Sequence, residues 1–258
     1  MFHRSAFSSR LMGDYRNEPM PSARVSKSES FSPHAEFVTA DAWMSAAGDA
    51  HDGGDWCETG ALPGANIALS IGDVAGHGAA VAARKRAIRG AIVHAMHRMR
   101  IPSDVLAIAN GTAHSDGSEA IVTAIVAFID VASRTLTFAN AGHPPPLLVT
   151  AGNARFLTRL HADVPLGVFA THGAADIELE LPAEVLVVFY TDGVTERERD
   201  PIAGERDLIA AARAAYERPQ APAANAIAGH VFADCRGTDD AAILTIRTGA
   251  RHVRHRRT

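Results

Sequence analysis

Residues 66–78 read N-I-A-L-S-I-G-D-V-A-G-H-G, an apolar run that ends in a glycine and an aspartate. Short apolar runs rich in β-branched residues and closed by turn residues predict buried strands. Apolar residues then recur at helical spacing over 77–100, which predicts a long helix. Asp73 therefore lies where a buried strand gives way to a helix. A carboxylate in this position is held by stiff backbone while its oxygens reach outward.

Further strands and helices are predicted on both sides of this unit. A second helix is expected to start at Pro102, because proline is favoured in the first helical turn. Two more helices are expected at 205–216 and 222–233. Grouped strands and paired helices favour α+β layering over a regular βαβ alternation. The other strand-like runs are 120–130, 135–140, 184–191 and 241–247.

Composition excludes several classes of protein. The chain has 258 residues, a formal net charge of −4 and 47% hydrophobic residues, which is typical of a globular protein. The slightly acidic balance disfavours a dedicated nucleic-acid binder. The longest apolar stretch, 120–129, is far shorter than the roughly 20 residues of a membrane span, so no membrane association is expected. Two cysteines and an N-terminus without an apolar signal core indicate a cytoplasmic protein.

We expect one domain between two short tails. The domain should run from 36 to 248, after an N-terminal leader at 1–35 that mixes serine, proline and both charge signs without a period. The tail at 249–258 is basic, with four arginines and no acidic residue. Most short basic tails are simply solvated, so the role of this one is left open.

Carboxylates recur where the predicted strands end or begin. Asp55 lies in D-G-G-D-W-C-E, Asp73 in I-G-D-V-A-G-H-G, and Asp192 in Y-T-D-G-V-T-E. Asp239 and Asp240 lie in T-D-D-A-A-I-L, just before the last strand. Taken singly, each motif is more often an ordinary turn. Carboxylates that converge repel one another unless cations lie between them, and hard divalent ions prefer such oxygen ligands.

Six segments occur in an order that is similar to a known family. They are G-G-D-W-C-E (53–58), G-D-V-A-G-H-G (72–78), F-A-N-A-G-H-P-P-P-L-L (138–148), P-L-G-V (165–168), Y-T-D-G-V-T-E (190–196) and T-D-D-A-A-I-L (238–244). Together they resemble the metal-dependent serine/threonine protein phosphatases of the PPM (type 2C) superfamily. Within that superfamily the chain resembles the bacterial RsbU/SpoIIE branch. The resemblance spans about 37–246, and the segments at 72–78 and 138–148 are its most specific part.

The resemblance implies a fold and a metal site. The family fold is an α+β, four-layer α-β-β-α sandwich of two antiparallel sheets flanked by helices. Its site holds two Mn²⁺ or Mg²⁺ ions, and by motif Asp73 would bridge both. The carbonyl of Val74 would join one ion, Asp192 and Asp239 would complete the shell of the other, and Asp55 would hold the second ion through water. Asp73, Asp192 and Asp239 are thus the predicted catalytic residues.

The same resemblance implies an activity. A water bridging two cations becomes a hydroxide near neutral pH and attacks the phosphorus of phosphoserine or phosphothreonine. No nucleophilic serine or cysteine is needed. In this branch the substrate is a phosphorylated STAS-domain anti-anti-sigma protein of a partner-switching pathway, which makes such a protein the expected partner. An upstream activator and a homodimer are further expectations from the family.

Several alternatives stay open from the sequence. The chain could be a non-catalytic interaction module with the same fold, although the acidic residues are all present. It could also hydrolyse a small phosphate ester. Glu58 stands where the family usually has an aspartate, which leaves its part in the site undecided. His77 is either a general acid or a packing residue at a helix start, and His143 is expected to stabilise a turn beside Asn140.

Overall fold

The computed structural model describes most of the chain between strands β1 and β11. The described residues are 25–30, 38–46, 53–64, 66–115, 117, 120–157, 164–196, 200–233 and 239–249. For 25–30 the backbone alone is described. The expected leader at 1–35 lies outside these residues except for β1, and the basic tail lies outside them beyond residue 249. The predicted domain boundaries therefore stay a prediction.

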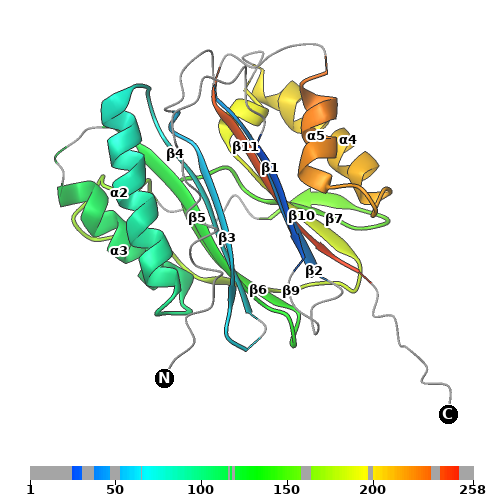
Figure 1. Cartoon of the computed structure of the whole chain (residues 1–258), viewed down its shortest axis with the longest axis horizontal. Coiled ribbons are helices and arrows are strands. Elements are labelled where there is room, and N and C mark those ends of the chain that lie inside the picture. Colours follow the sequence, from blue (N-terminus) through cyan, green and yellow to red (C-terminus); the bar gives the residue numbers. More distant parts are fainter. Residues whose placement is uncertain are drawn as a thin grey trace.

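The described strands form two antiparallel sheets that pack face to face (Figure 1). The first sheet has the order β1-β2-β11-β10-β7-β8, with β1 (Val25–Ser30), β2 (Val38–Ser45), β11 (Ala241–Thr248), β10 (Val185–Tyr190), β7 (Leu147–Val149) and β8 (Ala154–Phe156). The second has the order β3-β4-β5-β6-β9, with β3 (Trp56–Leu62), β4 (Asn66–Val74), β5 (Val122–Asp130), β6 (Thr135–Ala141) and β9 (Ile177–Glu180).

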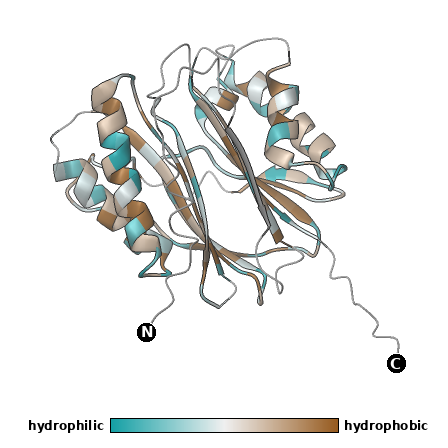
Figure 2. Ribbon diagram, in the orientation of Figure 1, coloured by the Kyte–Doolittle hydropathy of each residue, from teal (hydrophilic) through white to brown (hydrophobic). Residues whose placement is uncertain are grey.

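Two pairs of helices cover the outer faces of the sheets (Figure 1). Helices α2 (Ala79–Met96) and α3 (Pro102–Ser115) pack on the second sheet through buried residues such as Ile88 and Leu106. Helices α4 (Pro201–Tyr216) and α5 (Ala223–Val231) pack on the first sheet through residues such as Leu208. Figure 2 shows mainly hydrophobic residues along the strands and a mixture of hydrophobic and hydrophilic residues along the helices. The result is the four-layer α-β-β-α sandwich that the sequence predicted.

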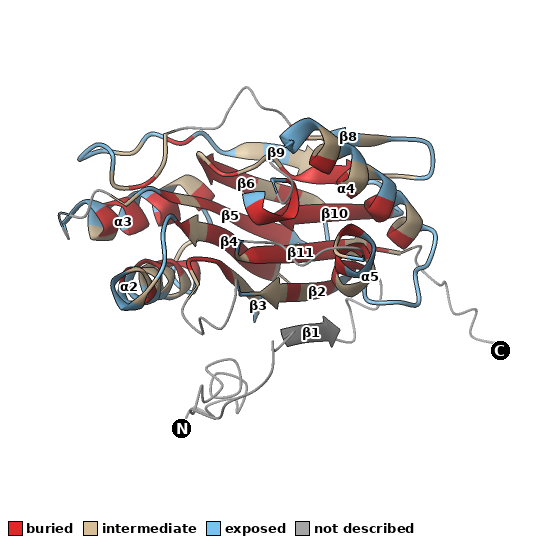
Figure 3. Cartoon of the chain, turned by 90° about the horizontal axis from the view of Figure 1, so that it is seen from above, coloured by how far each residue is buried: buried red, intermediate tan, exposed pale blue. Residues whose placement is uncertain are grey.

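Strand β10 illustrates how the layers are held together. Its residues V-L-V-V-F-Y are all buried, because one face meets the other sheet and the opposite face meets helices (Figure 3). Val187 and Phe189 join the core between the sheets, whereas Val188 and Tyr190 pack toward α4 and α5. A strand that is buried on both faces has a continuous apolar sequence, so β10 shows no alternation of apolar and polar residues.

The start of α5 is stabilised from a neighbouring strand. The N-cap residue of this helix is Pro222, which has no side-chain acceptor. The buried carboxylate of Asp41, on β2, accepts hydrogen bonds instead from the amides of Ala223 at 3.2 Å and Ala224 at 2.6 Å. It also accepts one from the hydroxyl of Thr245 at 2.6 Å. Negative charge at a helix N-terminus is favourable, and here it fixes α5 to the first sheet.

The structure confirms the predicted strands and helices within a few residues. The long helix predicted at 77–100 is shorter, at Ala79–Met96, because Gly78 has a φ of 95° and the chain leaves the helix at His97. Strands β1, β2, β3, β7, β8 and β9 were not predicted. In β2 and β3, partly exposed side chains interrupt the apolar pattern, and β7 and β8 have only three residues each. Among the described helices, none is long and apolar enough to span a membrane.

Candidate active site

Both sheets contribute acidic residues to one cluster. In the second sheet, Asp55 directly precedes β3 and Asp73 lies near the end of β4. In the first sheet, Asp192 follows β10, and Asp239 and Asp240 precede β11. The charges of these five residues influence one another, although they come from distant parts of the chain. The structure therefore brings together the acidic side chains that the sequence singled out; their service as metal ligands stays a prediction.

The two carboxyls of the second sheet are the most strongly perturbed. Asp55 is 4% exposed, and burial followed by the charge of Asp73 raises its pKa well above the ordinary value. Burial and then the charge of Asp192 raise the pKa of Asp73 to about 6. Hydrogen bonding to Asp55 lowers the pKa of Asp73 but does not offset these two causes. Such crowding of acids is costly in the metal-free protein and is relieved by a cation.

The acidic residues of the first sheet lie closer to solvent. Burial of its carboxyl and the charge of Asp239 raise the pKa of Asp192, even though the residue as a whole is exposed. Asp192 opens a single 3-10 turn, η2 (Asp192–Val194), and its carbonyl accepts hydrogen bonds from the amides of Thr195 and Glu196 at 2.8 and 2.7 Å. The backbone of this turn is fixed, and the charge of the Asp192 carboxylate contributes to the raised pKa values of Asp73 and Asp55.

Asp240 was not assigned a separate role from the sequence. Its carboxylate accepts a hydrogen bond of 2.7 Å from the amide of Gly54, across 186 positions of the chain. A Cβ at Gly53 would lie only 2.1 Å from the same carboxylate, so this close approach requires a glycine there. Asp239 accepts a hydrogen bond from the amide of Asp240 at 2.8 Å. Asp240 thus fixes the backbone at Gly54, just before β3 begins. Asp239 is the more exposed of the two aspartates.

Thr191 is a second residue that the sequence did not single out. Its hydroxyl donates to the carboxylate of Asp55 at 2.7 Å and accepts from the amide of Ala242 at 2.8 Å. The first contact crosses from one sheet to the other, while the second stays within the first sheet. Thr191 is fully buried, so both hydrogen bonds are shielded from water. The only sequence signal for it was its place immediately before Asp192.

The donor atoms of this cluster suit a hard divalent cation. Among the described residues, no three His, Cys, Asp or Glu side chains form a ready-made metal-binding group. The carbonyl of Val74 and a carboxylate oxygen of Asp73 nevertheless lie side by side at Gly54, where a Cβ would come within 2.2 and 2.5 Å of them. The donors are oxygen atoms, the carboxylates repel one another, and Gly54 leaves space beside two of the donors; we call this space the cradle at Gly54. These features fit Mg²⁺ or Mn²⁺ better than a metal that prefers thiolate or imidazole ligands.

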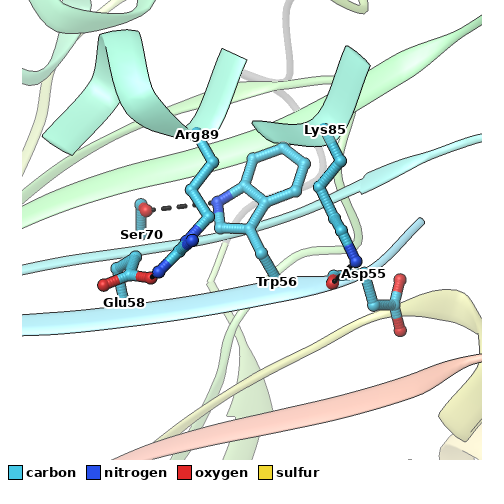
Figure 4. A network of polar contacts seen from close by, with 6 residues as sticks. All are labelled: Asp55, Trp56, Glu58, Ser70, Lys85 and Arg89. Atoms are coloured by element: carbon cyan, nitrogen blue, oxygen red, sulfur yellow. Dashed lines mark hydrogen bonds and ion pairs between the residues drawn. The ribbon is translucent and has the colours of Figure 1, made fainter. Parts of the chain in front are cut away.

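A polar network joins α2 to the strand that begins beside Asp55 (Figure 4). From α2, Lys85 donates to the carbonyls of Gly53 and Asp55, and Arg89 pairs with Glu58. The indole of Trp56 lies between these two cationic side chains and donates to the hydroxyl of Ser70 at 3.3 Å. Glu58, whose part in the site the sequence left undecided, is therefore engaged by Arg89.

The two histidines of the motifs have different settings. His143 is buried, and burial lowers the pKa of its ring to about 3, so the ring is neutral. Its Nδ1 lies 2.8 Å from the hydroxyl of Thr123, which pairs with Asp73 across β4 and β5. Asn140 bonds both the amide and the carbonyl of His143, at 2.7 and 2.8 Å, as expected for a turn-stabilising pair. His77 is exposed on the loop before α2.

Comparison with known proteins gives a family and a set of similar structures. The family model of stage II sporulation protein E (SpoIIE) matches residues 63–249. The RsbU and RsbW domains of a Mycobacterium tuberculosis protein match 80% of this chain at 29% identity, with a TM-score of 0.71. The chain spans 58% of the length of that structure.

More distant structures share the fold. The PP2C phosphatase domain of SpoIIE from Bacillus subtilis, with a fragment of its regulatory domain, matches 88% of this chain and is itself covered to 72%, at 17% identity and a TM-score of 0.72. The catalytic domain of the serine/threonine protein phosphatase PstP, in complex with two manganese ions, matches 83% of this chain and is covered to 99%, at 14% identity and a TM-score of 0.60.

Proposed function

Since the chain belongs to the SpoIIE family of PP2C-type phosphatase domains, we propose that it is a metal-dependent serine/threonine phosphoprotein phosphatase. The observation that carries the proposal is the meeting of acidic side chains from both sheets. Asp55 and Asp73 come from one sheet, and Asp192 and Asp239 from the other. A protein that used this fold for binding alone would have no need to keep so many mutually repelling carboxyls together.

Each residue of the cluster has a proposed task. Asp73, Asp192 and Asp239 would hold two Mn²⁺ or Mg²⁺ ions through their carboxylates, with the carbonyl of Val74, and Asp55 would hold one ion through water. Two such ions, when bound, lower the pKa of a water molecule and neutralise charge on a phosphoryl group. The chain's own contribution is to fix the donors. Asp55 is oriented by the hydroxyl of Thr191, as described above.

The proposed substrate is a phosphorylated STAS-domain anti-anti-sigma protein. Membership of the SpoIIE family supports this choice, as does the likeness to a structure that joins an RsbU domain to an RsbW domain. The proposal places the chain in a partner-switching pathway, where removal of a phosphate frees the STAS protein. A cytoplasmic location, an upstream activator and a homodimer belong to the same proposal.

The test is a phosphate-release assay on a candidate phospho-STAS protein, with Mn²⁺ and with EDTA. We expect turnover in Mn²⁺, loss of turnover in EDTA, and loss in Asp73→Asn at every Mn²⁺ concentration. A small ester such as p-nitrophenyl phosphate is run in parallel. Efficient hydrolysis of the small ester without any of the phosphoprotein would contradict the proposed substrate class. Binding of the STAS protein without turnover would instead favour a non-catalytic module.

A further inference from the structure

Lys85, from α2, contacts the backbone of the segment that carries Asp55 (Figure 4). Its ammonium donates hydrogen bonds to the carbonyl oxygens of Gly53 and Asp55, the second over 3.4 Å. Lys85 is partly buried, so water competes less for these hydrogen bonds than at an open surface. Helix α2 follows β4, the strand that carries Asp73. The hydrogen bonds of Lys85 therefore connect this helix to the segment that carries Asp55.

The segment 53–55 is held from its other sides as well. The amide of Gly54 donates to the carboxylate of Asp240 at 2.7 Å, and its carbonyl accepts from the amide of Val74 at 3.3 Å. These contacts and those of Lys85 fix successive peptide units. The side chain of Asp55 extends from this segment toward Thr191, so the orientation of the segment decides where the Asp55 carboxylate lies.

We propose that Lys85 is a positioning residue for divalent-cation binding, acting through the backbone of residues 53–55 on the carboxylate of Asp55. This inference rests on the proposed function, because it concerns the same cluster of acids. Lys85 directs its charge at main-chain carbonyls and is not itself a ligand, since an ammonium has no lone pair to offer a cation. Residues that orient ligands without touching the metal commonly govern metal affinity.

A neighbouring pair offers a matched control. Arg89 lies one helical turn beyond Lys85 and reaches β3, where it pairs with Glu58. One cationic side chain therefore docks α2 onto β3 and the other docks it onto the residues just before β3, on either side of Trp56 (Figure 4). Of the two, Lys85 is the one that contacts the carbonyl of Asp55. Loss of Arg89 should thus weaken the docking of α2 without releasing the segment 53–55.

The experiment compares Lys85→Met, Lys85→Arg and Arg89→Met in the full chain. Binding of Mn²⁺ is measured by titration calorimetry without substrate, and melting temperature is measured in EDTA. We expect Lys85→Met to weaken Mn²⁺ binding by about tenfold or more, as for other residues that orient metal ligands. Arg89→Met should lower the melting temperature at least as much and leave Mn²⁺ affinity close to that of the wild type. Lys85→Arg, which keeps a donor, should recover part of the affinity.

Two results would overturn the inference. One is wild-type Mn²⁺ affinity in Lys85→Met. The other is an equal loss of Mn²⁺ affinity in Lys85→Met and Arg89→Met. That result would mean that Lys85 only helps to dock α2 and does not position Asp55. Failure of the proposed function gives a different result, because the wild-type chain would then bind no Mn²⁺ and release no phosphate. The melting temperatures in EDTA separate both cases from a variant that fails to fold.

Discussion

The hydroxyl of Thr191 donates a hydrogen bond of 2.7 Å to the carboxylate of Asp55, from one sheet of the sandwich to the other. The same oxygen accepts the amide of Ala242 at 2.8 Å. A single buried oxygen, just after the end of β10, therefore links this strand to β11 and to an acid of the opposite sheet. The arrangement of the acidic cluster depends on this threonine as well as on the acids themselves.

Replacement of Thr191 by valine keeps the shape and removes the hydroxyl. The amide of Ala242 and the carboxyl of Asp55 then lose a buried partner, which should lower the free energy of unfolding by about 1–3 kcal/mol. Mn²⁺ affinity should fall as well, because Asp55 is no longer oriented. Urea denaturation in EDTA and Mn²⁺ titration measure the two effects. Thr191→Ser is the control, and if serine were as damaging as valine, the hydroxyl would not be the important group.

A methyl group at position 54 should damage the site directly. In Gly54→Ala the new Cβ would lie 2.2 Å from the carbonyl oxygen of Val74 and 2.5 Å from a carboxylate oxygen of Asp73, so these donors must move. Phosphatase activity and Mn²⁺ binding are expected to be lost. Gly60→Ala is the matched control on β3, the strand that Gly54 precedes, because its Cβ would meet nothing within 4 Å. Equal effects of the two substitutions on Mn²⁺ binding would show that the cradle at Gly54 is unimportant.

Asp73→Asn should have opposite effects on activity and on stability. Burial is the main cause of the raised pKa values of Asp55 and Asp73, and repulsion between the acids adds to it. Removal of the Asp73 charge ends its own burial cost and its repulsion with the other acids, so the metal-free variant should melt at a higher temperature than the wild type at about pH 7.5. In Mn²⁺ the order should reverse, since the variant lacks a ligand. Glu178→Gln, at an exposed position of β9, controls for net charge. A variant less stable than the wild type in EDTA would contradict the repulsion.

Stability of the metal-free protein should depend on pH through the same acid. Asp73 has a pKa of about 6 in the folded chain against an ordinary value of 3.8, so the folded chain binds its proton more tightly. Its contribution to stability is fully present below about pH 3.8 and is lost as the pH rises through about 6.

The measurement is the urea midpoint in EDTA at a series of pH values for the wild type and for Asp73→Asn. The difference between the two should grow from pH 4 to pH 6.5 and then level off. A difference that stays constant over this range would mean that Asp73 titrates normally in the folded chain.

The sequence was informative where a feature is local. Apolar runs predicted β4, β5 and β10, and the residues that flank them predicted the placement of Asp73 and Asp192. The motifs also predicted the family and its layered fold. These features depend on short stretches of chain, and their residue patterns can be recognised without knowing the tertiary structure.

The supporting contacts could not be predicted in this way. Gly54 meets Asp240 across 186 positions, Thr191 meets Asp55 across 136, and Lys85 meets Gly53 across 32. Each contact depends on how two sheets and a helix pack, and no local pattern encodes it. Strand β3 was also missed, because an edge strand with partly exposed side chains has a weak apolar pattern.

The division of the acids between two sheets has a mechanical consequence. Within each sheet, neighbouring strands are joined by backbone hydrogen bonds, whereas the sheets meet through interlocking aliphatic and aromatic side chains such as Ile71 and Phe189. Sliding of one sheet over the other is therefore a softer motion than separation of strands. The gap between the two groups of carboxylates is set by these interior hydrocarbon contacts together with the Thr191–Asp55 and Gly54–Asp240 hydrogen bonds, so residues with no chemistry of their own also adjust the spacing on which the proposed phosphate chemistry depends.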